Sequence, residues 1–398
     1  MTPGDATVSL STAALARLPP VQWPVVGIAA LLLALVAWQA SPLGWRMPAL
    51  ALIGAGLGIA LYFAAFGFSS AYRRLFALGD TRGAMAHVLL LALTTLVLAP
   101  VLARGEFMGM PVAGAIAPAG VQVAVGAFLF GIGMQLGGGC ASGTLYTAGS
   151  GNLRMVATLL AFCAGAFWAS LHLGFWSAAP HLPSIALGDA FGWPVALVLQ
   201  GVLFALIWFG LHRLGRGQGA AAPASRRPSP WRGAWPLAWG AVALAVLNGA
   251  TLLVAQHPWA ITWGYTLWGA KAAALTGWTP AAGDLWAGGY FRAALAASPF
   301  ADTVSIMNIG ILAGAMLAVG LAGNWAPDWR VPPRSLAAAV IGGVMLGYGA
   351  RIAYGCNIGA FISGVASTSL HGWLWILCAL PGNWIGMKLR PAFGLSAT

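Results

Sequence analysis

The sequence has very little charge. Only 7% of its 398 residues are Asp, Glu, Lys or Arg, whereas 60% are hydrophobic. Soluble globular domains carry about 25% charged residues. A soluble chain of this length would need far more charge to cover its surface. The composition therefore excludes a soluble globular protein and indicates an outer surface that faces lipid.

Acidic residues are the scarcest charges. Seven Asp and Glu stand against 19 Lys and Arg, which gives a formal net charge of +12. In a membrane protein, basic residues in short loops mark the cytoplasmic side. We therefore predict a cytoplasmic location for the basic segments, and no nucleic-acid binding, because little soluble mass is left to form a basic face. These segments contain Arg73, Arg74 and Arg82, and Arg213, Arg216, Arg226, Arg227 and Arg232.

Cysteine is also rare. The four cysteines, Cys140, Cys163, Cys356 and Cys378, form no CxxC pair and no Cys/His metal spacing. A zinc or iron–sulfur site is therefore not expected, and we predict no cofactor. The cysteines fall in apolar segments and not in a secreted loop, so a disulfide framework is not expected either. The sequence also has no ATP-binding loop and no pattern of a cleavable signal peptide.

Long apolar runs are abundant. A membrane-spanning helix needs about 20 mostly apolar residues. Such runs predict an all-α polytopic membrane protein with nine or ten spans. They lie at 24–40, 48–66, 85–103, 119–136, 155–176, 194–211, 235–255, 304–323, 336–350 and 371–387.

A basic linker rich in Pro, Gly and Ala, 212–234, divides the chain into an N-terminal membrane half, 1–211, and a C-terminal half, 235–398. Such a division is typical of transporters built from internal repeats. A shift of 216 residues aligns 126–145 with 342–361, and we interpret the match as a repeat. Whether the halves are inverted or parallel stays open at this point. The matches are Gly126 with Gly342, Gly131 with Gly347, Gly133 with Gly349, Gly139 with Gly355, Cys140 with Cys356 and Gly143 with Gly359.

The first repeated segment, 137–143, reads GGGCASG. Consecutive glycines are unfavourable in a helix but let the backbone turn sharply and approach a ligand. Broken helices at membrane depth occur where amides line a cavity, and helix N-termini bind anions. Close helix packing is the alternative explanation of the glycines. We predict a substrate-binding cradle that includes Gly138, Gly139, Cys140 and Ser142.

The second segment contributes Gly355, Cys356 and Asn357, preceded by Arg351. A charged side chain at membrane depth is costly and normally faces a cavity or a partner, and no acidic residue lies nearby in the sequence. We therefore predict that Arg351 helps to bind a small anion. The alternative is an arginine that reaches the lipid headgroups.

Both segments resemble the YeeE/YedE family of bacterial inner-membrane proteins, which are described as sulfur-transport or thiosulfate-uptake proteins. The residues that carry the resemblance are GIGMQLGGGCASGTLYTAGSGN at 131–152 and GYGARIAYGCNIGAFISGVASTSLHGW at 347–373. The resemblance implies an hourglass-shaped, multi-pass helical protein of the inner membrane, with short helices or re-entrant loops that dip toward its centre. It also implies that cysteine thiols pass thiosulfate along by hydrogen bonds, and that a soluble sulfur-carrier protein works alongside.

One position departs from the family. A further family cysteine lies between two phenylalanines, and this chain has Phe66, Gly67 and Phe68 there. Either Ser69 or Ser70 replaces that thiol, or the substrate is another species such as sulfite or a selenium compound. We expect a permease for a small sulfur-containing anion, with thiosulfate as the leading candidate, and not an enzyme. The alternatives are a membrane thiol enzyme and a scaffold that hands sulfur or selenium to a soluble carrier.

Overall fold

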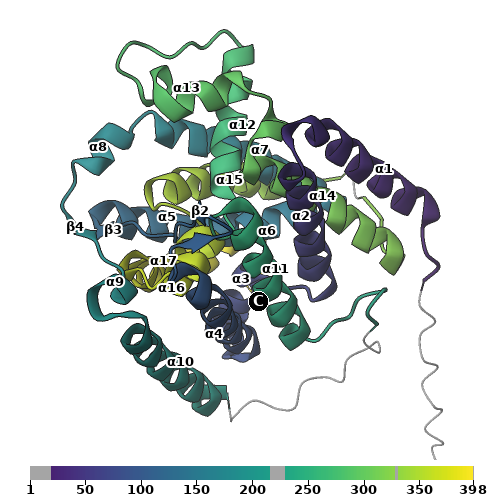
Figure 1. Ribbon diagram of the computed structural model, residues 1–398. Coiled ribbons are helices and arrows are strands. Elements are labelled where there is room, and N and C mark those ends of the chain that lie inside the picture. Colours follow the sequence, from purple (N-terminus) through teal and green to yellow (C-terminus); the bar gives the residue numbers. More distant parts are fainter. Residues whose placement is uncertain (1–18, 216–228, 328–329, 398) are drawn as a thin grey trace, which may run out of the picture.

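The computed structural model describes residues 19–215, 229–327 and 330–397 (Figure 1). Within these ranges nearly all regular structure is helical, and the strands are four short pieces. Nine helical segments of the described residues are long and apolar enough to cross a membrane. The prediction of an all-α polytopic membrane protein is therefore confirmed. The strands are β1 (Glu106–Phe107), β2 (Met110–Pro111), β3 (Pro118–Gly120) and β4 (His181–Ser184).

Three of these nine segments are interrupted by a break followed by a shorter helix. The tenth expected run, 371–387, forms helix α17 (Leu370–Leu389), which is not among the nine. The nine segments contain α1 (Trp23–Ala40), α2 (Arg46–Phe63) with α3 (Phe68–Leu78), α4 (Arg82–Leu102), α5 (Val121–Gly137) with α6 (Ala141–Gly149), α7 (Leu153–Ser170), α10 (Trp193–Gly215), α11 (Leu237–Ala255), α14 (Thr303–Ala322), and α15 (Pro333–Ile352) with the π-helical η4 (Asn357–Ile362) and α16 (Ser363–Ala366).

The helices differ in how much lipid they meet. Only 17% of the residues in the α1 and α10 segments are buried, and both helices lie at the outside of the molecule (Figure 1). In the α14 segment 72% are buried. Helix α12 (Thr262–Leu275) packs against α7 and leads into a lobe at one end, which carries α13 (Gly289–Ala296) (Figure 1). The remaining short helices are α8 (Leu173–Ser177) and α9 (Leu187–Phe191).

Glycines bring α5 and α15 into backbone contact. A Cβ on Gly126 would lie 2.6 Å from the Gly349 carbonyl oxygen, and a Cβ on Gly349 would lie 2.4 Å from that of Gly126. Further along, a Cβ on Gly133 would lie 2.8 Å from the Gly342 oxygen. Because the position numbers rise on one helix as they fall on the other, the two helices run antiparallel.

Two neighbouring helices, α17 and α7, make equivalent contacts with α5 and α15. A Cβ on Gly382 of α17 would lie 2.1 Å from the Phe128 oxygen of α5, and a Cβ on Gly165 of α7 would lie 2.4 Å from the Val344 oxygen of α15. Val344 lies 216 residues after Phe128. Reciprocal contacts of this kind are expected of an inverted repeat. The repeat and the division into halves nevertheless stay predictions.

The predicted linker is only partly described. Helix α10 continues to Gly215, so the first residues of 212–234 are helical, and residues 216–228 lie outside the described ranges. The two predicted halves also pack closely together. A Cβ on Gly54 of α2 would lie 2.3 Å from the carbonyl oxygen of Met307 in α14.

Candidate functional site

The first cysteine segment begins a short helix in the interior. Helix α5 ends at Gly137, and the next residue, Gly138, has a φ of 92°, in the left-handed region that glycine adopts without strain. Gly139 follows, and Cys140 then caps α6. The Gly143 N–H donates to Cys140 Sγ at 3.3 Å, and Ser142 Oγ lies 3.3 Å from the same sulfur. Cys140 is 1% exposed, so this thiol is held among hydrogen-bonding groups away from water.

The second cysteine segment has the same local design. Gly355, with a φ of 154°, precedes Cys356, which caps η4 and accepts a hydrogen bond from the Ile358 N–H at 3.4 Å. Cys356 is fully buried. Both cysteines are free thiols. A neutral buried thiol can still donate its own S–H to a guest.

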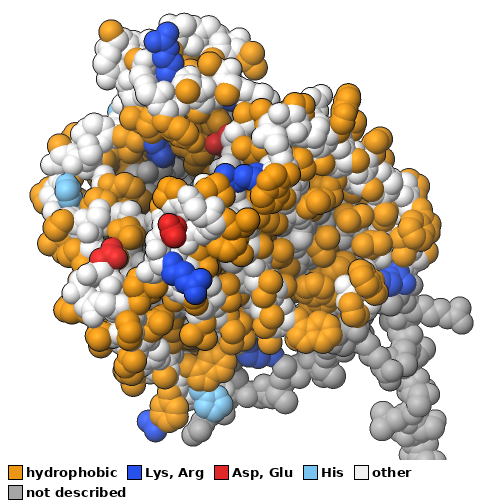
Figure 2. Space-filling view, in the orientation of Figure 1, with side chains coloured by type: hydrophobic (Ala, Val, Ile, Leu, Met, Phe, Trp, Pro, Cys, Tyr) orange, Lys and Arg blue, Asp and Glu red, His pale blue; other side chains and the backbone are white. Residues whose placement is uncertain are grey.

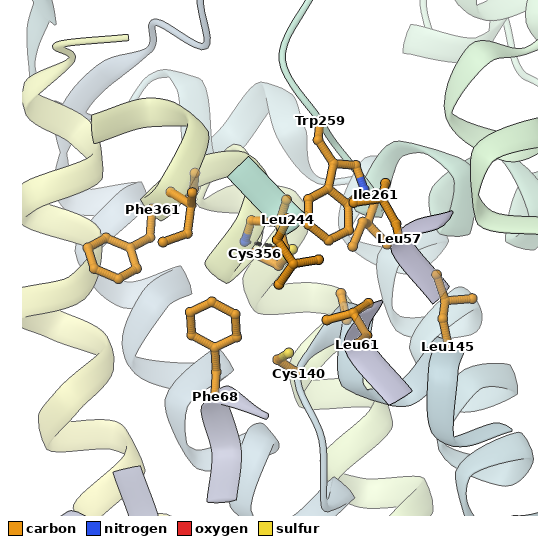
Figure 3. Packing of buried hydrophobic residues seen from close by; sticks show 14 of the residues in the cluster. Leu57, Leu61, Phe68, Cys140, Leu145, Leu244, Trp259, Ile261, Cys356 and Phe361 are labelled. Atoms are coloured by element: carbon orange, nitrogen blue, oxygen red, sulfur yellow. Dashed lines mark hydrogen bonds between the residues drawn. The ribbon is translucent and has the colours of Figure 1, made fainter. Parts of the chain in front are cut away.

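The two cysteines belong to one packed cluster. Figure 3 shows Cys140 and Cys356 in the same interior region, with Phe68, Leu61 and Phe361 around them. The backbone amide of Phe68, the first residue of α3, also points at the Cys140 thiol. Three helical segments therefore begin at this region. Their free N–H groups and dipoles favour a negative charge there.

Asn357 gives this region a polar group without a partner. Its side chain is fully buried, and neither Nδ2 nor Oδ1 has a hydrogen-bond partner among residues 19–215, 229–327 and 330–397. The Tyr72 hydroxyl lies beside it, and the Tyr265 hydroxyl donates to the Ala141 carbonyl oxygen at 2.8 Å. Leaving a buried amide unpaired costs about 1–3 kcal/mol. The cost would be recovered if a small polar guest bonded to it.

Arg351 has different neighbours from the cysteines. Its guanidinium lies over the rings of Trp263, at 5.5 Å, and Phe291, at 5.7 Å. Its Nε atom is buried without a partner. Among the described residues no carboxylate pairs with it. The structure thus sets Arg351 against the aromatic rings of α12 and α13, whereas the other predicted site residues lie at the helix breaks.

A cavity of about 490 Å³, which we call the basic-side cavity, lies on one side of the cysteines. Gly67 borders it, next to Phe68 of the cysteine cluster. The end of α10 lies close to this cavity. A Cβ on Gly215, the last residue of α10, would lie 2.4 Å from Oγ1 of Thr81, whose neighbours Asp80 and Arg82 line the cavity. Its polar lining residues are Ser70, Arg74, Asp80, Arg82 and His87.

A second cavity of about 490 Å³, the lobe-side cavity, is lined by Gln122, Tyr354 and Trp286. It adjoins the lobe, beneath which the surface is hollowed (Figure 2). Tyr354 is two residues before Cys356, and Gln122 donates a hydrogen bond to the Tyr354 hydroxyl. Each cavity is thus bordered by a residue at one helix break, since Gly67 immediately precedes α3 and Tyr354 lies between α15 and Cys356.

Two hydroxyl groups lie near the space that a side chain at position 67 would occupy. A Cβ on Gly67 would lie 2.7 Å from Ser70 Oγ and 3.6 Å from the Tyr146 hydroxyl oxygen. Ser69 Oγ instead donates to the Met134 carbonyl oxygen at 2.9 Å. Of the two serines considered for this position, Ser70 is therefore the one that presents its hydroxyl beside the glycine.

The sulphur transport family model matches residues 63–385, which include every one of these site residues. The chain belongs to this family. Among curated relatives, the probable transporter YedE of Escherichia coli is 34% identical over 142 residues, 34% of this chain and 33% of YedE. This chain therefore spans about a third of that relative's length.

Two thiosulfate transporters named TsuA match a larger part of this chain than YedE does. TsuA of Spirochaeta thermophila is 29% identical over 284 residues, 65% of this chain and 74% of TsuA. TsuA of Escherichia coli is 25% identical over 281 residues, 65% of this chain and 72% of that protein.

Sequence reasoning missed the tyrosines of the site. Tyr72 was overlooked because it precedes Arg73 and Arg74, which we interpreted only as basic residues on the cytoplasmic side. Tyr265 lies in the region after the linker, far from either cysteine in the chain. An aromatic residue with a polar tip in an apolar run is the signal that could have drawn attention to it.

Proposed function

We propose that this sulphur transport family member is an inner-membrane permease that takes up a small sulfur-containing anion, and that this anion is thiosulfate. The observation that carries the proposal is the convergence of two buried thiols, the starts of three helical segments and the unpartnered Asn357 amide in one interior region. The match to two thiosulfate transporters supports the choice of substrate.

The groups suit a divalent anion with a soft terminal sulfur. The Asn357 Nδ2 would donate to an oxygen of the anion, and the amides at the helix starts would provide positive potential. The Cys140 and Cys356 S–H groups would donate weak hydrogen bonds to its sulfur. Both thiols must stay protonated, because a thiolate in this dry region would repel the anion. The two cavities would give access in turn from opposite sides.

Arg351 would serve this permease by attracting the anion toward the lobe-side cavity. We expect Arg351→Gln to lower the rate of thiosulfate uptake at low substrate concentration by about tenfold, the effect of losing roughly 1.4 kcal/mol of attraction. Arg351→Lys, which keeps the charge, should retain most of the uptake. Initial rates of labelled thiosulfate uptake in cells measure both variants. Equal loss in both would assign Arg351 to packing against Trp263 and Phe291.

The basic-side cavity should open to the cytoplasm. Gly67→Cys places a thiol at its edge, and the fold should tolerate the change because the nearest atom is the mobile hydroxyl of Ser70. We expect a membrane-impermeant maleimide to label this variant in inside-out vesicles and not in right-side-out vesicles. The unmodified chain is the control, since three of its four cysteines are buried. Labelling from the outside only would reverse the proposed orientation.

A membrane thiol enzyme is the second candidate, because the two free thiols share one cluster. In that case the thiolate of Cys140 or Cys356 would attack the outer sulfur of thiosulfate, the S–S bond of the anion would break, and a persulfide and free sulfite would result. Serine cannot form such a persulfide. A soluble sulfur-carrier protein remains a proposed partner of either activity. The serine variants described below separate the two candidates.

A further inference from the structure

We propose that His87 binds a proton together with the anion in the basic-side cavity, so that this residue couples anion transport to a proton. The inference rests on the proposed transport function. Its ligand is a small divalent oxyanion, held beside an imidazole ring that gains a positive charge when the anion arrives.

The surroundings of His87 make it unlike the other histidines. Its ring is stacked on Phe68, with centroids 4.1 Å apart and an interplanar angle of 14°. Phe66 and Tyr72 contact it edge-on, at 5.4 and 5.3 Å. His87 is 4% exposed, lines the cavity and has a buried Nδ1 with no hydrogen-bond partner in the part of the chain that the structure describes. No hydrogen bond therefore fixes this nitrogen in either protonation state.

The cavity wall beside the ring carries a net positive charge. Arg74 and Arg82 each lie 2.7 Å from Asp80 Oδ2. The hydrogen bonds from Arg82 hold the pKa of the Asp80 carboxyl well below its usual range, so this carboxylate stays ionised. Two positive charges and one negative charge leave a net charge of +1. That net charge, together with desolvation, opposes a second cation at His87.

The other helices that pack against α4 add little charge near the ring. Helices α11 and α16 contain no titratable residue, and α3 adds Tyr72 and Arg74, already described, together with Arg73, which does not line the cavity. Strand β1 adds Glu106, which follows the far end of α4. Helix α10 carries His212 and Arg213 in its last turn, and the Arg213 guanidinium lies over the Phe209 ring at 4.4 Å. The charge that His87 meets is therefore set mainly by the cavity wall and by whatever occupies the cavity.

An anion in the cavity reverses this balance. A divalent anion changes the local charge from +1 to −1, which favours the imidazolium form of His87. One hydronium ion of the solution then gives its proton to the lone pair of the neutral ring and is left as water, and no other bond forms or breaks. The face of Phe68 stabilises the cation that results. The Ser70 hydroxyl, which also lines the cavity, donates to the Gly67 carbonyl oxygen at 3.1 Å and would have to rotate to donate to an oxygen of the anion.

Proton uptake on thiosulfate binding tests this proposal. With purified protein in weakly buffered detergent solution, a pH dye should report about one proton bound per anion at pH values between the titration ranges of the empty and the occupied ring. The dissociation constant for thiosulfate should rise about tenfold per pH unit there, because binding then requires a proton. In His87→Gln and in His87→Phe, which keeps the stacking, proton uptake should vanish and the dissociation constant should not change with pH.

His212→Gln is the control, since this exposed histidine lies at the end of α10 on the same side. It should behave like the unmodified protein. Proton uptake that persists in both His87 variants, or that is absent from the unmodified protein while thiosulfate binds, overturns the role of His87. No thiosulfate binding at all by the folded, unmodified protein would instead contradict the proposed function.

Discussion

Replacing either central cysteine with alanine should nearly abolish thiosulfate uptake. Each substitution removes an S–H donor from a dry site, and a hydrogen bond to a charged partner contributes about 1.5–3 kcal/mol. We therefore expect Cys140→Ala and Cys356→Ala each to lower the uptake rate by roughly 10- to 100-fold. The measurement is growth on thiosulfate as sole sulfur source, with initial uptake rates, in a strain that lacks its own uptake systems.

Serine variants and a remote cysteine make this prediction specific. Cys140→Ser and Cys356→Ser keep a donor and should retain measurable uptake if the thiols act by hydrogen bonding. Loss with serine as well as alanine would favour covalent chemistry. Cys163→Ala is the matched control, because Cys163 is a buried free thiol within continuous helix α7. Full uptake in the alanine variants of Cys140 and Cys356 would contradict both thiol-based mechanisms.

Adding one methyl group where two helices touch should greatly reduce the amount of folded protein. In Gly382→Ala the new Cβ would lie 2.1 Å from a backbone oxygen of α5, and in Gly165→Ala it would lie 2.4 Å from a backbone oxygen of α15. Backbone atoms cannot move aside without shifting a helix. Overpacking of this kind costs about 1–3 kcal/mol, and occasionally more. Both variants should show a lower melting temperature and poor recovery as a monodisperse species.

The surface of α10 supplies the control for these glycines. No atom lies within 4 Å of the Cβ position of Gly201, so Gly201→Ala should be neutral or slightly stabilising because alanine favours a helix. Similar losses in Gly382→Ala and Gly165→Ala are expected if the two contacts are equivalent in an inverted repeat. A normal melting temperature for either one would show that the helices are less closely packed than described.

The membrane helices were predictable because their signal is local. A run of about 20 apolar residues is sufficient to predict a span, whatever it packs against. The breaks before Cys140 and Cys356 were predictable for a similar reason, since clustered glycines and a following polar residue are properties of the segment itself. Both cysteines indeed cap short helices in the structure.

The surroundings of these segments depend on tertiary packing and were not predictable. The sequence put Arg351 near Cys356, but its neighbours Trp263 and Phe291 come from a lobe far along the chain. Trp259 is a second case, because tryptophans of membrane proteins are typically found at the membrane surface, whereas Trp259 is 1% exposed and packs in the cysteine cluster (Figure 3). Composition cannot tell a buried indole from one at the membrane surface.

We expect this protein to move thiosulfate across a membrane by itself, through the region of Cys140 and Cys356. Uptake of labelled thiosulfate into liposomes that contain only the purified protein tests it most directly. We predict uptake above that of empty liposomes for the unmodified protein, and background uptake for a folded Cys140→Ala/Cys356→Ala double variant. No uptake by the folded, unmodified protein, or equal uptake by the double variant, would contradict the account.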